Sequence, residues 1–153
     1  MLSFEHQIQL RGLNLAGVLP EEFANLTNLT EMNLIGNRIS GSIPEEIGDI
    51  STLEELLASA NNFTGTIPES YGNLTNLEDF RIDGSSLSGR IPDFIRNWTN
   101  LMRLDLQGTS MEGPIPSSIS LLTKLKELRI TDLAGTSSSS FPNLQAMTQM
   151  TRL

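Results

Sequence analysis

Adjacent carboxylates are the residues in this sequence that come nearest to catalytic groups. Paired acids can act as a general acid and a general base, and the pairs here are Glu21-Glu22, Glu45-Glu46 and Glu54-Glu55. The first two pairs directly follow Pro20 and Pro44, at the start of predicted helical turns, where acidic side chains are favourable and solvated. We therefore interpret these pairs as a solvated surface and not as catalytic groups.

Nucleophilic and metal-dependent chemistry lack the side chains that they need. His6 is the single histidine, so any Ser-His-Asp arrangement would depend on a residue in the first few positions of the chain. There is no cysteine, which excludes disulfides and thiol chemistry, and no cluster of potential ligands indicates a metal site. We expect no catalytic residue, no cofactor and no bound metal.

Asparagine sequons indicate a different chemistry, N-linked glycosylation of a secreted or cell-surface protein. Three of them directly precede the same apolar position of a repeated segment, which would place glycans in a row on one flank. The alternative is chance, because Asn, Ser and Thr are frequent here and repetition multiplies any one sequon. The candidate glycosylation sites are Asn25, Asn28, Asn62, Asn73 and Asn97.

A strict repeat sets the elements that must position these residues. Leu29, Leu53, Leu77, Leu101 and Leu125 lie 24 residues apart, and each opens the phrase L-x-x-L-x-L-x-x-N-x-L-x-G-x-I-P-x-x-I-x-x-L. A fixed period of this length is typical of solenoids, in which successive coils stack and bury a shared core. The phrase is that of the leucine-rich repeat.

Two periodicities within each repeat predict the two sides of a coil. Alternation of Met32 and Leu34 with Glu31 and Asn33 predicts a short strand, and a later apolar spacing of three or four residues predicts an irregular or helical return. We therefore predict an α/β repeat solenoid with a curved parallel β-sheet on one side and irregular or 3-10 helical segments on the other. The strands are expected at 8–10, 32–34, 56–58, 80–82, 104–106 and 128–130.

The corner after each strand carries a polar residue that could bond the backbone of the turn. Asn37 and Asn61 occupy this position in two coils, and a side-chain amide can both donate and accept there. Ser85 and Thr109 take the same place later. We expect this ladder of side-chain hydrogen bonds to weaken toward the carboxyl terminus.

The whole chain, residues 1–153, is predicted to be one domain of about six coils, uncapped at both ends. The run AGTSSSS predicts a loop insertion at 134–140, after which Phe141 and Pro142 resume the Ile-Pro position, and Leu153 should open a seventh coil. An exposed apolar end and an unpaired strand edge predict a marginally stable isolated chain. The predicted coils are 8–28, 29–52, 53–76, 77–100, 101–124 and 125–152.

Composition restricts the partners. The chain is 38% hydrophobic, which suffices for a thin continuous core. A net charge of −8 and a pI near 4.5 argue against nucleic acid or an anionic membrane surface as the partner. No apolar run has the length of a membrane span, and the amino terminus lacks the basic start and apolar segment of a signal peptide. A membrane link is expected only through segments outside this sequence.

The Gly-x-Ile-Pro element carries the most specific resemblance. It occurs at 41–44, 65–68, 89–92 and 113–116, where glycine permits a tight approach and proline fixes one backbone angle. These repeats resemble the plant-type leucine-rich repeat of receptor-like kinases and polygalacturonase-inhibiting proteins. The segment 82–133, with the irregular FPNLQAMTQMTRL that follows it, resembles the ectodomain of leucine-rich-repeat receptor-like serine/threonine kinases that also carry a malectin-like domain.

This resemblance implies an extracellular recognition module at the plant cell surface, which binds a protein, peptide or glycan ligand or a co-receptor ectodomain in signalling. The sequence holds no kinase motif, so the resemblance implies no enzyme activity for this chain, although its parent would be a serine/threonine protein kinase. The alternative is a soluble inhibitor of cell-wall-degrading enzymes, like the polygalacturonase inhibitors.

The outward strand positions form the predicted partner-binding face. Opposite charges alternate there along and across the later strands. These charges either form ion pairs that only satisfy one another, or present guanidinium donors to a carboxylate-bearing or polar partner. The candidate partner-binding residues are Asp79, Arg81, Asp83, Arg103, Asp105, Gln107 and Arg129.

Overall fold

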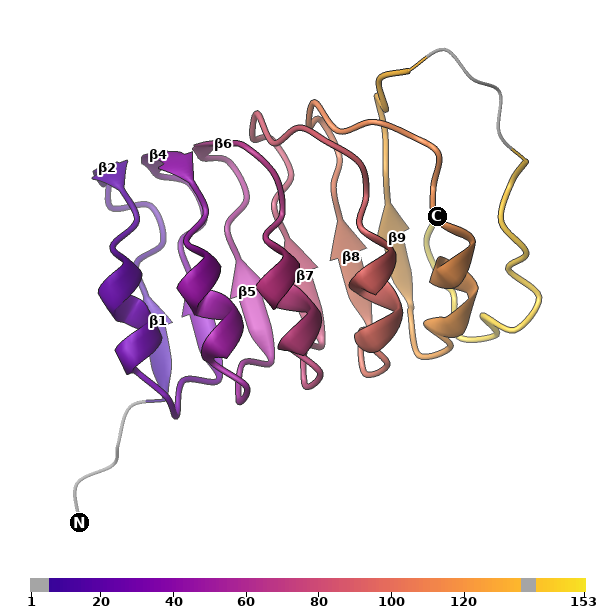
Figure 1. The fold of residues 1–153 in the computed structure, drawn as a ribbon, viewed down its shortest axis with the longest axis horizontal. Helices are drawn as coiled ribbons and strands as arrows, with labels where there is room; N and C mark the ends of the chain where they lie inside the picture. The colour runs from indigo at the N-terminus through magenta and orange to yellow at the C-terminus, as the bar shows by residue number, and fades with distance from the viewer. Residues whose placement is uncertain (1–5, 136–139) are drawn as a thin grey trace.

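The computed structural model describes residues 6–135 and 140–153. The chain forms a single row of stacked coils, with short strands along one side and 3-10 helices along the other (Figure 1). This arrangement confirms the predicted leucine-rich-repeat solenoid. None of the helices in the described part of the chain is long and apolar enough to cross a membrane.

A parallel sheet of six short strands forms one side of the solenoid, in the order β1-β3-β5-β7-β8-β9. Its register pairs residues one repeat apart, such as Met32 with Leu56 and Leu56 with Phe80, and these middle residues are buried. Each strand begins one residue before the predicted position. The strands are β1 (Gln7–Gln9), β3 (Glu31–Asn33), β5 (Glu55–Leu57), β7 (Asp79–Arg81), β8 (Arg103–Asp105) and β9 (Glu127–Arg129).

A second parallel sheet lies beyond the corner of the coil and was not predicted. It consists of β2 (Ala16–Val18), β4 (Arg38–Ser42) and β6 (Asn62–Thr64), in the order β2-β4-β6. The sequence did contain a signal for it, because Ile39 and Ile43 flank Gly41 with polar residues between them, which is a period of two. The stretch expected to be the irregular return path therefore begins with a short strand.

Five 3-10 helices form the return side, and each begins directly after the proline of the repeat. These prolines have φ between −60° and −69°, the angle that their rings impose. Each helix closes with a bond between residues three apart, such as the Ile50 N–H donating to the Ile47 carbonyl at 3.1 Å. The helices are η1 (Glu21–Asn25), η2 (Glu45–Asp49), η3 (Glu69–Asn73), η4 (Asp93–Asn97) and η5 (Ser117–Leu121).

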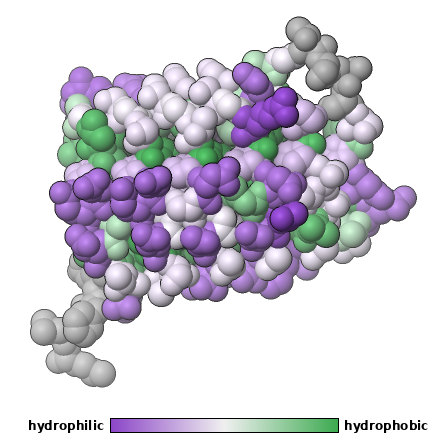
Figure 2. Space-filling model, viewed as in Figure 1, coloured by the Kyte–Doolittle hydropathy of each residue, from purple (hydrophilic) through white to green (hydrophobic). Residues whose placement is uncertain are grey.

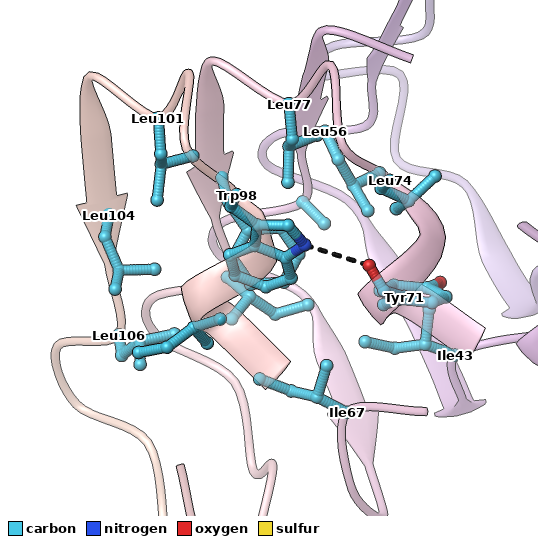
Figure 3. Packing of buried hydrophobic residues seen from close by; sticks show 14 of the residues in the cluster. Ile43, Leu56, Ile67, Tyr71, Leu74, Leu77, Trp98, Leu101, Leu104 and Leu106 are labelled. Atoms are coloured by element: carbon cyan, nitrogen blue, oxygen red, sulfur yellow. Dashed lines mark hydrogen bonds between the residues drawn. The ribbon is translucent and has the colours of Figure 1, made fainter. Parts of the chain in front are cut away.

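The two largest side chains of the core also join neighbouring coils by hydrogen bonds. The Trp98 indole N–H donates to the Tyr71 carbonyl at 2.9 Å (Figure 3). The Tyr71 hydroxyl donates to the Pro44 carbonyl at 3.1 Å. Both side chains are fully buried, and the Trp98 ring packs on Phe80 at a centroid distance of 5.1 Å. The polar ends of these aromatic residues are thus satisfied inside the core.

The predicted corner ladder is present and follows the predicted gradient. The buried Asn61 side chain accepts from the Ile39 N–H at 3.1 Å and donates to the carbonyls of Leu34 and Ala58 at 2.9 and 3.1 Å. It therefore joins its own coil to the preceding one. Asn37 makes an equivalent set of bonds one coil earlier.

The later corners use hydroxyl groups and lose the link between coils. The Ser85 hydroxyl donates to the Ile82 carbonyl at 2.8 Å, and the Thr109 hydroxyl donates to the Leu106 carbonyl at 3.0 Å. Both bonds stay within one coil. A carboxamide has an oxygen acceptor and a separate NH2 donor that reach two coils at once, whereas a hydroxyl has a single oxygen. Among the described residues, the ladder of side-chain bonds between coils therefore ends after Asn61.

The coil after β9 differs from the prediction in its length. Arg152 pairs with Glu127 in the parallel register, which makes Met150 equivalent to Leu125. The next coil therefore opens at Met150 and not at Leu153, and the sixth coil holds 25 residues. The leucine at 153 suggested the wrong opening because methionine can fill the same apolar position.

The return path of this coil also departs from the repeat. Phe141 is 68% exposed, so it does not take the buried Ile-Pro position that the sequence suggested, while Met147 is buried. The predicted loop insertion at 134–140 falls largely on residues 136–139, which lie outside the described residues. Ala134, at its start, still bridges Glu112 in line with the second sheet.

We predict that Asn61→Ala destabilises the solenoid more than Ser85→Ala does. Loss of the amide leaves buried N–H and carbonyl groups of two coils without partners, at a cost of about 2 to 4 kcal/mol, whereas the serine change removes one bond within a coil and costs about 1 kcal/mol. Urea denaturation of both variants measures the difference. Equal losses would show that the amide does not join the coils.

Candidate functional site

The outward positions of the main sheet form a continuous surface of two columns. In each strand the middle residue points inward, so the first and third residues face out. Leu57 and Asp105 are exceptions, since they are 5% and 2% exposed although both are third residues of their strands. The first column is Gln7, Glu31, Glu55, Asp79, Arg103 and Glu127, and the third-residue column is Gln9, Asn33, Leu57, Arg81, Asp105 and Arg129.

We use the term charged face for the outward residues of β7, β8 and β9. Asp79 and Arg81 form an ion pair within β7, in which the guanidinium Nε lies 2.8 and 3.0 Å from the two carboxylate oxygens. Their side chains are 15% and 27% exposed. The hydrogen bond with Asp79 raises the pKa of Arg81, so its charge is fixed at any physiological pH.

A second, longer network joins β8, β9 and the chain end. Arg103 lies 3.4 Å from both the Asp105 and the Glu127 carboxylates, and Arg129 lies 3.6 Å from Asp105. Arg152 completes the chain of charges at 3.6 Å from Glu127. Asp105 is almost fully buried between two guanidinium groups, which offset the cost of removing its charge from water.

Sequence reasoning identified most of this network but not all of it. Glu127 and Arg152 were not among the predicted residues, although both pair with residues that were. Arg152 was missed because the predicted opening of the next coil at Leu153 hid its register with β9. The Arg103 Nε is buried without a hydrogen-bond partner among the described residues, so this network is not fully satisfied.

Two predicted residues lie apart from the ion pairs. The Asp83 carboxylate accepts a hydrogen bond from the Ser59 hydroxyl, one coil earlier. The Gln107 backbone N–H donates to Asp105 at 3.3 Å, while its side chain is exposed. The structure thus brings Arg103, Asp105 and Arg129 together, pairs Asp79 with Arg81, and leaves Asp83 and Gln107 on the neighbouring corner.

The amino-terminal half of the same sheet is acidic. Glu31, Glu55 and Asp79 occupy equivalent positions on three adjacent strands. Burial raises the pKa of Glu55, and the negative charges of Glu31 and Asp79 raise it further. The sheet therefore changes along its length from an acidic column to a mixed network.

The asparagines of the predicted glycosylation sites are all exposed. Asn25, Asn73 and Asn97 are the last residues of η1, η3 and η4, and all three are exposed. The Asn97 side chain also donates to the Gly72 carbonyl at 3.0 Å. Asn28 and Asn62 are exposed as well.

The carboxylate pairs, His6 and the potential metal ligands do not come together as a site in the described part of the chain. The carboxylate pairs at 21–22 and 45–46 lie in the first turns of η1 and η2, and His6 lies 2.8 Å from the Asn28 carbonyl. Over residues 6–135 and 140–153, no group of three or more His, Asp or Glu side chains comes together as a metal site would require.

We predict that Glu55→Gln stabilises the protein at neutral pH. Because the folded-state pKa of Glu55 is raised, its ionised form is disfavoured in the folded state, and like charges directly opposite on a sheet cost about 0.3 to 1 kcal/mol. The gain should disappear as the pH falls below the unfolded value near 4.5, where the wild-type side chain is also neutral. Urea unfolding at neutral and acidic pH measures this, with exposed Glu54→Gln as the control. A gain that persists at acidic pH would contradict it.

Comparison with protein families identifies the repeat. A family model described as Leucine Rich Repeat matches residues 28–50, 52–74 and 100–122. A probable LRR receptor-like serine/threonine-protein kinase of Arabidopsis thaliana is 63% identical over 30 residues, which are 20% of this chain and 3% of that protein.

Solved structures extend this likeness over most of the chain. The ectodomain of the Arabidopsis receptor kinase HAESA, in complex with an extended IDA peptide hormone, is 32% identical with a TM-score of 0.84, over 95% of this chain and 25% of its own. A chain of the BIR3–SERK2 complex from Arabidopsis thaliana is 34% identical with a TM-score of 0.70, over 74% of this chain and 61% of its own. This chain thus spans only part of each of these relatives. It has the leucine-rich-repeat solenoid fold, and it is similar to the ectodomains of plant leucine-rich-repeat receptor kinases.

Proposed function

We propose that this chain is an extracellular recognition module of a plant receptor-like serine/threonine kinase, and that its charged face binds a peptide ligand or a co-receptor ectodomain. The observation that carries the proposal is the match of 95% of the chain to the HAESA ectodomain, a structure that contains a peptide hormone. The BIR3–SERK2 structure supports the co-receptor option, because it is a complex of two proteins with a similar chain.

The geometry of the charged face suits such a partner. The Arg81 and Arg129 side chains are 27% and 34% exposed, so each keeps N–H groups available after pairing with its carboxylate. Ion pairing holds the guanidinium planes in place on a rigid sheet, which lowers the entropy lost when a partner binds. A peptide carboxylate or backbone carbonyl can then accept directional bonds from both.

The finer assignment rests on the resemblance of the segment 82–133. We propose that the parent receptor carries a malectin-like domain, a membrane span and a cytoplasmic kinase, and that it acts in signalling at the plasma membrane. The exposed sequons on the η helices support an extracellular location. We also propose that these sequons carry glycans, which deglycosylation and mass spectrometry of protein secreted from plant cells would detect.

We predict that Arg81→Gln combined with Arg129→Gln weakens partner binding by about tenfold or more, because paired guanidinium bonds to a partner are lost. Arg96→Gln is the matched control, since Arg96 also pairs with an aspartate, Asp93 at 3.2 Å, but lies on η4. Binding is measured against the IDA peptide and the SERK2 ectodomain, with thermal unfolding of each variant in parallel.

The thermal measurement separates recognition from a purely structural role of the ion pairs. Loss of Arg129 leaves the buried Asp105 with Arg103 as its remaining partner, so we expect some loss of stability in the double variant. Binding is therefore measured well below the unfolding temperature of each variant, where recognition predicts lost binding by a chain that is still folded. If the double variant binds as well as the Arg96→Gln control, the charged face is not the binding site. If the wild-type chain binds none of these ligands, the proposed function loses its support.

A further inference from the structure

A second surface, on the opposite flank from the charged face, has the features of a peptide-binding groove. A hollow of about 1310 Å³ follows the Gly-x-Ile-Pro turns across five successive coils, between the second sheet and the starts of the 3-10 helices. We call it the turn groove. Figure 2 shows it as a green band of apolar residues that runs along the solenoid above a purple row of polar ones.

The bottom of the turn groove is apolar because of the repeat itself. The Leu or Ile of the Gly-x-Ile-Pro element lines it in the first four coils, where it is 4% to 5% exposed, and the proline that follows lines it in all five. On one wall stand the variable residues of the same element, of which Val18 is 67% exposed. Each of the five coils thus contributes at least one apolar residue to the lining of the same groove.

The other wall is strongly acidic. It carries Glu21, Glu22, Glu45, Glu46 and Glu69 from the first turns of η1, η2 and η3. None of these five carboxylates forms an ion pair with a described residue, in contrast to the carboxylates of the charged face. Their charge is therefore available to a cationic partner.

The charge of the groove changes at its far end. Asp93 also lines the acidic wall, but it pairs with Arg96 at 3.2 Å, and Arg90 stands in the facing wall of the same coil. The fifth coil contributes prolines and no charge to the lining. The excess of negative charge is thus concentrated over the first three coils.

The dimensions of the groove suit an extended chain. Stacked coils are about 4.8 Å apart, so five of them span roughly 20 Å, which about six extended residues would cover. Glycans at the predicted sites would not fill it. Asn25, Asn73 and Asn97 end their helices, whereas the groove is lined by the first residues of those helices.

We infer that the turn groove binds an extended segment of a partner protein in which lysine or arginine residues are interspersed with proline or small apolar residues. The basic side chains would face the unpaired carboxylates of η1 to η3, and the apolar ones would cover the Ile-Pro floor. An acidic polysaccharide is disfavoured by the same carboxylates. This surface is independent of the partner proposed for the charged face.

The test uses the whole chain and a fluorescein-labelled peptide of alternating lysine and proline, with alternating glutamate and proline as the negative probe. Fluorescence anisotropy at about 50 mM salt keeps electrostatic attraction measurable. We expect the triple variant E45Q/E46Q/E69Q to weaken binding of the basic peptide about tenfold. The matched control is D49N/E54Q/E78Q, which removes the same number of charges away from the groove and should change binding by less than about twofold.

A steric variant separates the groove from general acidity. Thr66 is exposed in the wall, and Thr66→Trp should obstruct the floor and weaken binding without any change of charge. The charged-face variant R81Q/R129Q should leave binding of the basic peptide unchanged, so the two proposals fail separately. Equal weakening by the control triple variant, no effect of Thr66→Trp, or no preference for the basic over the acidic peptide would overturn the inference.

Discussion

Each coil of this protein depends on its neighbours, because the backbone hydrogen bonds of its strands run between coils. The Leu34 N–H donates to the Leu57 carbonyl at 2.7 Å, and the Ala58 N–H donates to the Arg81 carbonyl at 2.8 Å. One coil alone would leave these groups unpaired and its apolar wedge in water, at a cost that no local contact could offset. A regular register between equivalent residues of neighbouring coils is the consequence, and it holds even where the sixth coil has 25 residues, because Arg152 still pairs with Glu127.

Two different side-chain devices reinforce this stacking along the solenoid. In the amino-terminal half the carboxamides of Asn37 and Asn61 bridge the corners, whereas the middle relies on Tyr71 and Trp98, whose polar atoms reach the carbonyls of the preceding coil. Tyr71 lies in the same coil as Asn61, so both side chains join that coil to the preceding one, whereas Trp98 supplies the bond in the coil whose corner residue is Ser85. The main sheet continues without interruption through β8 and β9.

The features that could be predicted from the sequence are those that depend on the stacking of the coils. A shift of one residue would turn Met32 or Phe80 to solvent, so the sequence pattern determines the parallel register and the inward residues. Charges on outward positions follow from the same register, which is why five of the seven predicted partner residues take part in the observed ion pairs. The sequence pattern is not sufficient where a different residue type occupies a repeat position. In the second sheet, Gly41 occupies the position between Ile39 and Ile43 where an apolar side chain would have completed the alternation. At the start of the next coil, Met150 stands in place of the expected leucine, so the register of Arg152 could not be predicted.

The solenoid leaves two sides free, and they differ in how they use charge. On the charged face, Asp105 lies buried between Arg103 and Arg129, so opposite charges neutralise one another and leave directional N–H donors at a fixed spacing. In the turn groove the carboxylates remain unpaired beside an apolar floor, which favours attraction over directional recognition. The same repeated backbone carries both surfaces, because equivalent positions of successive coils form columns. Surface columns can change in residue type while the inward residues that stack the coils stay the same. The chemistry of recognition can therefore differ between two sides of the same coils at no cost to the core that holds them.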